Sequence, residues 1–397
     1  MASGPAAPDV ATRHGEPTEH VVRRLGALTT AHLLSDGAGN FLPGVLPAVL
    51  VVLGQPVSMA GALVAALSIG QVLQPLVGWV ADRVGGRVLP PLGLLLTSVG
   101  GGLIGVVPST GVLMVLLLAI GVGSSLFHPP SLASIRAMAG RRTGLAISVF
   151  LVGGELGRGL WPTVASLITA HLGLTWLWLI AIPGLVWLPL LYHWMPRLPA
   201  APTDRAPIRW RRHAFPAALL IGFRGLQGFT VFSLSAFIPI LWHVRGESLV
   251  AGASVITTVI TVGVAGNLLG GFLADRIGRR PVLLASAVGV AALVLPVAHV
   301  PGWWVFPIAA ALGIALFLPA ASTILIGQYI FPENRSMGSG IALGLANGLA
   351  AVAVLVVGLF VTETNVLMVF WILAVLALAC IVVAVALPAE LMRREEI

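Results

Sequence analysis

Apolar runs of about 20 residues follow one another along almost the whole chain, long enough for each to cross roughly 30 Å of hydrocarbon as a helix. Of the 397 residues, 58% are hydrophobic and only 9% are charged. A soluble domain is about 25% charged, so this composition cannot supply a water-soluble surface and excludes a cytosolic enzyme. The chain is therefore predicted to be an all-α membrane protein that crosses the bilayer many times.

Twelve membrane-spanning helices are predicted from the apolar runs. They cover about 25–53, 58–81, 88–107, 110–137, 143–170, 174–195, 214–242, 248–274, 281–299, 302–328, 336–361 and 364–387. All 22 basic residues are arginine, and 19 of them fall on one side of this arrangement, while Arg245 falls on the other and two lie within spans. Because positive loops stay in the cytoplasm, both termini are predicted to be cytoplasmic, in a multi-pass protein of the inner membrane. The net charge of +8 thus reflects topology, and no nucleic acid is expected as a partner.

An internal repeat divides the chain into two halves. Residues 78–87 match 271–280, Leu126-Phe127 matches Leu316-Phe317, and 144–146 matches 340–342, at offsets of 190 to 196 residues. A duplication of this size predicts two six-helix bundles. The predicted organisation is an N-terminal tail (1–22), an N-terminal bundle (23–195), a cytoplasmic linker (196–213), a C-terminal bundle (214–388) and a C-terminal tail (389–397).

The repeated Gly-x-x-x-Asp-Arg-x-Gly loops resemble the signature loop of the major facilitator superfamily, which implies two pseudo-symmetric six-helix bundles that work by alternating access. A carboxylate at such a helix end can contact the positive N-terminus of a helix in the other half when the cytoplasmic side is closed. The loops are therefore interpreted as a conformational latch made of Gly78, Asp82, Arg83, Gly85, Arg87, Gly271, Asp275, Arg276, Gly278 and Arg279. The alternative is a tight, positive turn that only fixes topology.

Three further segments, residues 32–47, 127–129 and 149–162, are similar to the fosmidomycin-resistance branch of that superfamily. This second resemblance implies a proton-driven exporter of small, often anionic, drugs. The chain departs from the branch pattern at Pro130, Glu155 and Arg158.

Four charged residues, Asp36, Glu155, Arg158 and Arg224, lie within predicted spans. A charge at mid-membrane costs at least about 2.5 kcal/mol, so it normally faces a cavity and has a function. His32 lies one helical turn before Asp36, and carboxylate and imidazole groups on one face suit proton binding. The proton-coupling residues are expected to be Asp36, Glu155, His32 and His128.

Simpler roles stay open for the same residues. Asp36 and His32 can form a polar stripe that packs helix 1. His128 can instead cap a helix that the two prolines after it are expected to interrupt. Glu155 and Arg158 are three residues apart and can pair on one helix face.

Arg224 is expected to contact an anionic substrate, because a guanidinium stays charged when buried and holds a carboxylate or phosphonate with two hydrogen bonds. Its alternative is a structural ion pair with Asp36 or Glu155. Further substrate-binding candidates are Arg158, Asn40, Gln227 and Asn347.

These observations favour a proton-coupled secondary transporter that exports a small organic compound, with uptake of an organic acid by symport or facilitated diffusion as the alternative. The chain holds no P-loop and no His-Glu-x-x-His motif, so neither ATP hydrolysis nor an intramembrane enzyme is expected. No metal and no cofactor beyond the proton gradient is expected. The expected partners are the substrate, protons and the lipid bilayer, and we expect a monomer.

Overall fold

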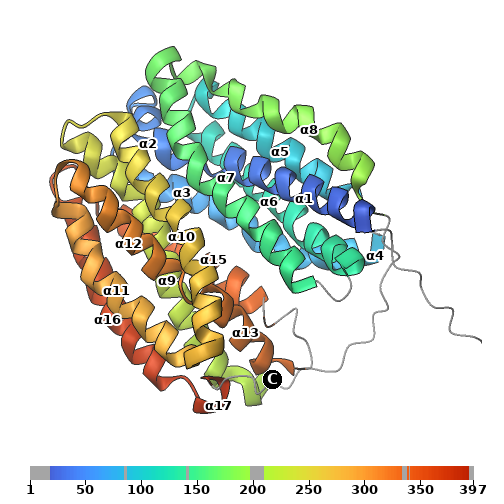
Figure 1. The fold of residues 1–397 in the computed structure, drawn as a ribbon. Helices are drawn as coiled ribbons and strands as arrows, with labels where there is room; N and C mark the ends of the chain where they lie inside the picture. Colours follow the sequence, from blue (N-terminus) through green and yellow to red (C-terminus); the bar gives the residue numbers. More distant parts are fainter. Residues whose placement is uncertain are drawn as a thin grey trace, which may run out of the picture.

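The computed structural model describes residues 18–84, 87–139, 143–196, 210–332, 338 and 340–392, and every regular element in these ranges is helical (Figure 1). Ten of its helical segments are long and apolar enough to cross a membrane. Two of the twelve predicted spans are not among these ten, yet both contain helix. One is α7 (Thr143–Leu172), which carries Glu155 and Arg158. The other contains the shorter apolar helix α15 (Ala346–Gly358).

The first half of the chain ends its last helix at Trp194. Its elements are α1 (Thr18–Asn40), α2 (Leu42–Val52), α3 (Met59–Gly70), the 3-10 segment η1 (Gln71–Leu73), α4 (Gln74–Val84), α5 (Leu89–Leu103), η2 (Ile104–Val106), α6 (Thr110–Ala139), α7, η4 (Leu174–Ile180) and α8 (Ala181–Trp194). Helix α1 begins inside the predicted tail, at Thr18. The first predicted span is two helices, because Pro43 has no N–H to continue the ladder and the helix breaks at Phe41.

The second half begins with α9, which starts inside the predicted linker. Its elements are α9 (Trp210–Val244), α10 (Leu249–Ile277), α11 (Arg279–His299), η5 (Gly302–Trp304), α12 (Val305–Phe317), α13 (Ala320–Ile330), the π-helical segment η7 (Ile341–Leu345), α15, α16 (Leu367–Ala386) and α17 (Ala389–Met392). The tenth predicted span is broken between α12 and α13, where Pro319 follows Leu318.

Helix α6 corrects one expectation. Pro129 and Pro130 were expected to interrupt it, but α6 runs unbroken from Thr110 to Ala139 with both prolines inside. A proline in a packed transmembrane helix is tolerated because neighbouring groups satisfy the carbonyls that it leaves free. Beside the prolines, the Ser125 hydroxyl donates to the Gly70 carbonyl on α3, and the His128 ring bonds the Ser124 carbonyl of its own helix. Polar contacts with α3 and within α6 therefore hold this part of the helix.

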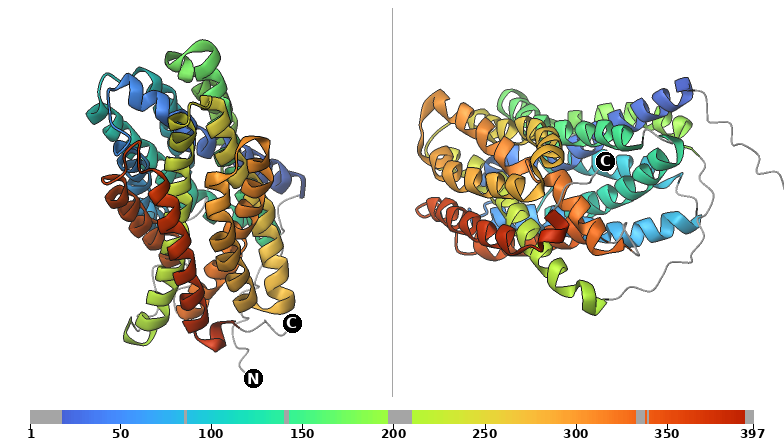
Figure 2. Two further views of the ribbon diagram at one scale, coloured as in Figure 1. Left: turned by 90° about the vertical axis from the view of Figure 1, so that its left-hand side faces the viewer. Right: turned by 60° about the horizontal axis from the view of Figure 1, so that its bottom comes forward.

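The two halves pack together at one end of the molecule. We call the end that holds the start of α1 and the end of α17 the terminal side, and the other end the far side (Figures 1 and 2). Contacts between the halves join α2, α3 and α7 of the first half to α9, α10 and α15 of the second. Helices α4 and α13, on the terminal side, pack mainly within their own halves.

The distribution of the apolar core matches these contacts. One large cluster crosses both halves on the far side and includes Phe41 and Phe237. Two separate clusters lie nearer the terminal side, one around Phe127 and Phe150 in the first half and one around Phe223 in the second. The halves therefore share a core on the far side and diverge toward the terminal side.

Candidate functional site

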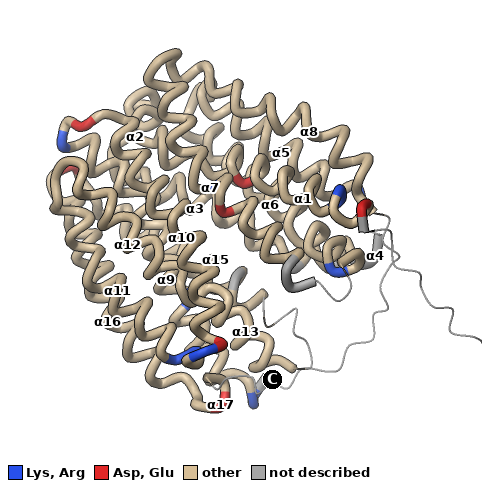
Figure 3. Tube along the Cα trace, viewed as in Figure 1, with Lys and Arg blue, Asp and Glu red and all other residues tan. Residues whose placement is uncertain are grey.

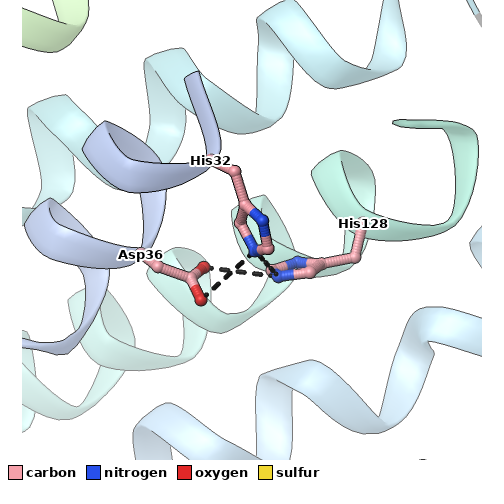
Figure 4. A group of neighbouring side chains, drawn as sticks. All are labelled: His32, Asp36 and His128. Carbon is pink, nitrogen blue, oxygen red and sulfur yellow. Dashed lines mark hydrogen bonds and ion pairs between the residues drawn. The ribbon is translucent and has the colours of Figure 1, made fainter. Parts of the chain in front are cut away.

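A buried polar cluster lies inside the first half, where α1, α6 and α7 meet (Figure 4). Asp36 is at its centre. His32 Nε2 lies 3.5 Å from Asp36 Oδ2, and His128 Nε2 lies 3.3 Å from Oδ1. Arg158 Nη2 donates to Oδ2 at 3.1 Å. The side chains of His32 and Asp36 are 3% and 2% exposed. Three protein partners therefore take the place of water around this carboxylate.

Glycines in α7 allow α1 to come this close. A Cβ on Gly154 would lie 2.2 Å from His32 Nε2, and one on Gly157 would lie 2.1 Å from the Leu33 carbonyl oxygen. The Phe150 ring stacks on the His32 ring with centroids 4.0 Å apart. These two glycines of α7 therefore make room for the His32 imidazole.

Arg158 pairs with Asp36, and this settles an alternative that spacing within one helix left open. Glu155 bonds instead to the second half of the chain, since Asn267 Nδ2 of α10 donates to Glu155 Oε1 at 2.9 Å. Glu155 Oε2 and Arg158 Nε are buried and have no hydrogen-bond partner among the described residues. Glu155, on the same helix as Arg158, therefore connects the buried cluster around Asp36 to the interface between the halves.

Arg224 lies in the second half and has its own network. Its Nε donates to the Ala342 carbonyl of the π-helical segment η7 at 3.4 Å, and its Nη1 donates to Gln227 Oε1 at 3.2 Å. Gln227 Nε2 in turn donates to Ser286 Oγ at 3.1 Å. Within the part of the chain that the structure describes, Arg224 forms no ion pair, so the pair with Asp36 or Glu155 that was weighed from the sequence is absent.

The remaining substrate-binding candidates have local contacts. Asn40 Nδ2 donates to the Asp36 backbone carbonyl at 3.0 Å, one turn back on α1. Asn347 on α15 lies against Gly228 of α9, next to Gln227 in the chain. The structure thus groups Asn347 with the Arg224 network and Asn40 with the Asp36 cluster, and their part in binding stays a prediction.

The latch residues lie on the terminal side. Gly78 packs against Pro129, and its repeat mate Gly271 packs against Ala321. The basic residues contact their own halves: Arg87 bonds the Tyr192 carbonyl, Arg276 lies over the Phe272 ring and Arg279 bonds the Leu391 carbonyl. Asp275 is exposed, and Gly278, with φ of 88°, forms the turn from α10 to α11. Gly85 and the side chains of Asp82 and Arg83 lie outside the described residues.

Most of the charged positions that the structure describes lie near helix ends, whereas acidic positions also lie inside the bundle (Figure 3). Sequence reasoning placed His32 and Asp36 on one face of a helix. It did not assign their partners on α6 and α7, nor the contact between Glu155 and Asn267. The signal that could have indicated the Asp36–Arg158 pair was the equal number of acidic and basic residues inside the spans.

A metal ion is a poorer fit to the cluster than a proton. The donor atoms of His32, Asp36 and His128 lie within 4.8 Å of one another, a spacing that a single ion can bridge. Arg158 already places a positive charge against Asp36, however. A divalent ion would give the group of Asp36, Glu155 and Arg158 a net positive charge inside the bundle, whereas one proton leaves it neutral.

Comparison with known proteins agrees with this architecture. The family model of the Major Facilitator Superfamily matches residues 28–264 and 222–396. The chain is 27% identical over 365 residues to the fosmidomycin resistance protein of Escherichia coli K12, covering 89% of this chain and 90% of that protein. It is 26% identical over 349 residues to the uncharacterized transporter YfnC of Bacillus subtilis 168, with 82% and 83% covered.

Solved structures share the fold. A mutant of the nucleoside transporter NupG superposes with a TM-score of 0.75 at 16% identity, covering 92% of this chain and 99% of that one. A bacterial homologue of the human lysosomal transporter Spinster gives a TM-score of 0.70 at 16% identity, with 96% and 100% covered. With the helical bundle, the paired signature loops and these matches together, the chain belongs to the Major Facilitator Superfamily and is a multi-pass membrane transporter.

Proposed function

We propose that this transporter exports a small organic anion across the inner membrane in exchange for protons, working as a monomer with both termini in the cytoplasm. The observation that carries the proposal is the buried Asp36 carboxylate, held between Arg158 and two imidazoles. A buried charge needs compensation, so loss or gain of one proton in this cluster changes which conformation is favoured. The resemblance to the fosmidomycin resistance protein of Escherichia coli supports export as the direction. A partial match to the multidrug resistance protein MdtG of Dickeya zeae, 34% identical over 188 residues and 45% of each chain, supports it too.

The two halves divide the work in this proposal. The first half binds the proton, and Glu155 links its cluster to α10 of the second half. The second half offers the Arg224 guanidinium, which has no acidic partner among the described residues and keeps its charge when buried. An anionic substrate would supply the missing negative charge, in hydrogen bonds that are about 1.5–3 kcal/mol each.

The test uses purified protein in liposomes that contain a pH-sensitive dye, with fosmidomycin as the probe. If substrate is exchanged for protons, adding the probe outside makes the lumen more alkaline. Symport makes it more acidic, and facilitated diffusion leaves the pH unchanged. The probe should be recovered chemically unaltered, because a transporter forms and breaks no bond in it.

Two variants test the assigned sites in the same liposomes. Asp36→Asn should abolish coupled proton movement, and Arg224→Ala should raise the half-saturating probe concentration at least about tenfold, the equivalent of one charge-assisted hydrogen bond. Arg245→Ala is the matched control, since Arg245 directly follows α9 on the far side and bonds the Ala298 carbonyl. Full coupled flux in both Asp36→Asn and Arg224→Ala would refute the proposed sites.

A further inference from the structure

The two histidines of the cluster have their tautomers fixed by backbone groups. His32 Nδ1 lies 2.7 Å from the Phe150 carbonyl oxygen, and His128 Nδ1 lies 2.8 Å from the Ser124 carbonyl oxygen. A carbonyl oxygen can only accept a hydrogen bond, so in both rings Nδ1 carries a hydrogen. A neutral ring has one such hydrogen, which leaves a bare lone pair on each Nε2.

These two Nε2 atoms face each other at 3.0 Å, with the imidazole rings nearly perpendicular at 84° (Figure 4). Two bare lone pairs at this distance repel, and both also face the Asp36 carboxylate. The contact becomes a hydrogen bond when one ring carries a second hydrogen, as an imidazolium. Protonating Asp36 instead would leave the two lone pairs opposed, and it would weaken the charge-assisted bond from Arg158.

We propose that one proton shared between His32 Nε2 and His128 Nε2, and not a proton on the Asp36 carboxyl group, is the transported proton in this conformation. This inference rests on the proposed function and names the atoms that carry its proton. In the exchange, a proton is bound between the two rings and later leaves to solvent, and no other bond is formed or broken.

The charges around the pair agree with one proton. On α1 the pair faces Asp36, and on α7 it faces Arg158 and, farther away, Glu155. In the part of the chain that the structure describes, α6 and α10 contribute the neutral groups Ser124 and Asn267. With two carboxylates, one guanidinium and one imidazolium, the cluster is electrically neutral, which is the least costly state for buried charges.

Aromatic rings enclose the pair and favour a positive ring. The Phe150 ring stacks on His32, and the Phe127 ring centroid lies 5.6 Å from both imidazole centroids. The face of an aromatic ring attracts a cation within about 6 Å. The stacked Phe150 ring therefore stabilises an imidazolium at His32, and neither phenylalanine ring supplies a competing acceptor.

The test is solid-state nitrogen NMR on the full chain in bilayers, with ring-labelled histidine and EDTA present to exclude metals. At about pH 8 a free imidazole is neutral, because its ordinary pKa is about 6.5. We expect an imidazolium signal equal to one of the nine histidines. It should vanish in His32→Gln and also in His128→Gln, because either change removes one half of the shared site.

Two further variants separate the proton from folding. His128→Asn keeps an amide N–H near the position of Nδ1 for the Ser124 carbonyl but has nothing at Nε2, so it should fold and still lose the signal. His299→Gln is the matched control, since His299 Nδ1 bonds the Leu295 carbonyl one turn back, as in His128, but its ring is exposed on the far side. That variant should keep the signal.

A second sample with carbon-labelled aspartate reports the carboxyl groups. Three outcomes would decide against the shared proton: no imidazolium in the unmodified chain at about pH 8, a signal that survives in either Gln variant, or a protonated carboxyl resonance that disappears in Asp36→Asn. Proton flux in the same liposomes distinguishes the two proposals. Coupled flux with neutral rings overturns only the shared proton, whereas absence of any proton flux overturns the proposed function.

Discussion

At residue 154 the chain has no side chain, and the His32 ring occupies the space where one would lie. A Cβ there would come within 2.2 Å of His32 Nε2. Gly154→Ala must therefore displace the ring from His128, and overpacking of this kind costs about 1–3 kcal/mol. We expect a lower melting temperature in detergent and a larger, separate loss of proton-coupled flux.

Gly26→Ala on α1 provides the control for this change. Among the described residues, no atom outside the backbone of α1 lies within 4 Å of a Cβ at Gly26. Alanine is the better helix former, so Gly26→Ala should keep or slightly raise the melting temperature and leave flux unchanged. If Gly154→Ala transported protons as well as Gly26→Ala does, the close contact between α7 and the His32 ring would have no role in coupling.

At the residue scale, the sequence predicted which residues carry charge inside the membrane, but it did not predict which of them pair. The spacing of His32 and Asp36 was enough to predict a shared face, because the period of a helix is fixed. The partner of Arg158 was not predictable in this way, because helices α1 and α7 are joined only through tertiary packing. Glu155, three residues away on its own helix, was an equally good partner by spacing alone.

At the scale of elements, α7 and α10 form the polar seam between the halves. Thr163 donates to Thr257 at 2.8 Å near the far side, and Asn267 donates to Glu155 farther toward the terminal side. A Cβ on Gly159 would lie 2.3 Å from Thr261 Oγ1, so the two backbones are in close contact along this seam. Any opening of the far side must separate these pairs.

Asn267→Asp makes that separation depend on pH. It places a second carboxylate against Glu155, and two carboxylates so close cannot both be ionised without repulsion. At high pH the pair should repel and favour a conformation open on the far side, while at low pH one shared proton should restore the seam. Spin labels at Leu172 and Val244, both exposed on the far side, would report the distance.

Two features make the label distances easy to interpret. Cys380, the chain's one cysteine, is buried, so labels attach to the introduced cysteines. Asn267→Gln keeps the amide and serves as the neutral comparison. A label distance in Asn267→Asp that did not change with pH would argue against the seam as a gate.

Helix boundaries agreed with the apolar runs of the sequence, except at prolines, where packing of neighbouring helices decides whether a helix breaks. The number and order of the apolar runs predicted the helices, since burial in lipid requires continuous apolar stretches. Pro43 and Pro319 lie at breaks, yet Pro129 and Pro130 sit inside α6, where close packing against α3 and α5 holds the helix together. The π-helical segment η7, which supplies the carbonyl for Arg224, had no signal in composition or periodicity.

At the scale of the whole molecule, the halves touch on the far side and diverge on the terminal side, where the latch residues lie. The described latch arginines contact their own halves in this conformation. If the loops act as a latch, their contacts across the interface form only when the terminal side closes. An exposed Asp275 is then free to bind a helix N-terminus of the other half, a contact of about 0.3–1 kcal/mol for a surface carboxylate.

Asp275→Asn should therefore shift the population toward the conformation described here without altering its contacts. Labels at Leu76 on α4 and Leu325 on α13, both exposed, would measure closure of the terminal side. The contact energy corresponds to a fall in the closed fraction of up to about fivefold, given that 1.4 kcal/mol is tenfold. Glu363→Gln, an exposed acid on the far side, should leave the distances unchanged. Equal distance distributions in Asp275→Asn and the unmodified chain would mean that the loop only fixes the topology of the chain. Alternating access would then have to be controlled by the α7–α10 seam alone.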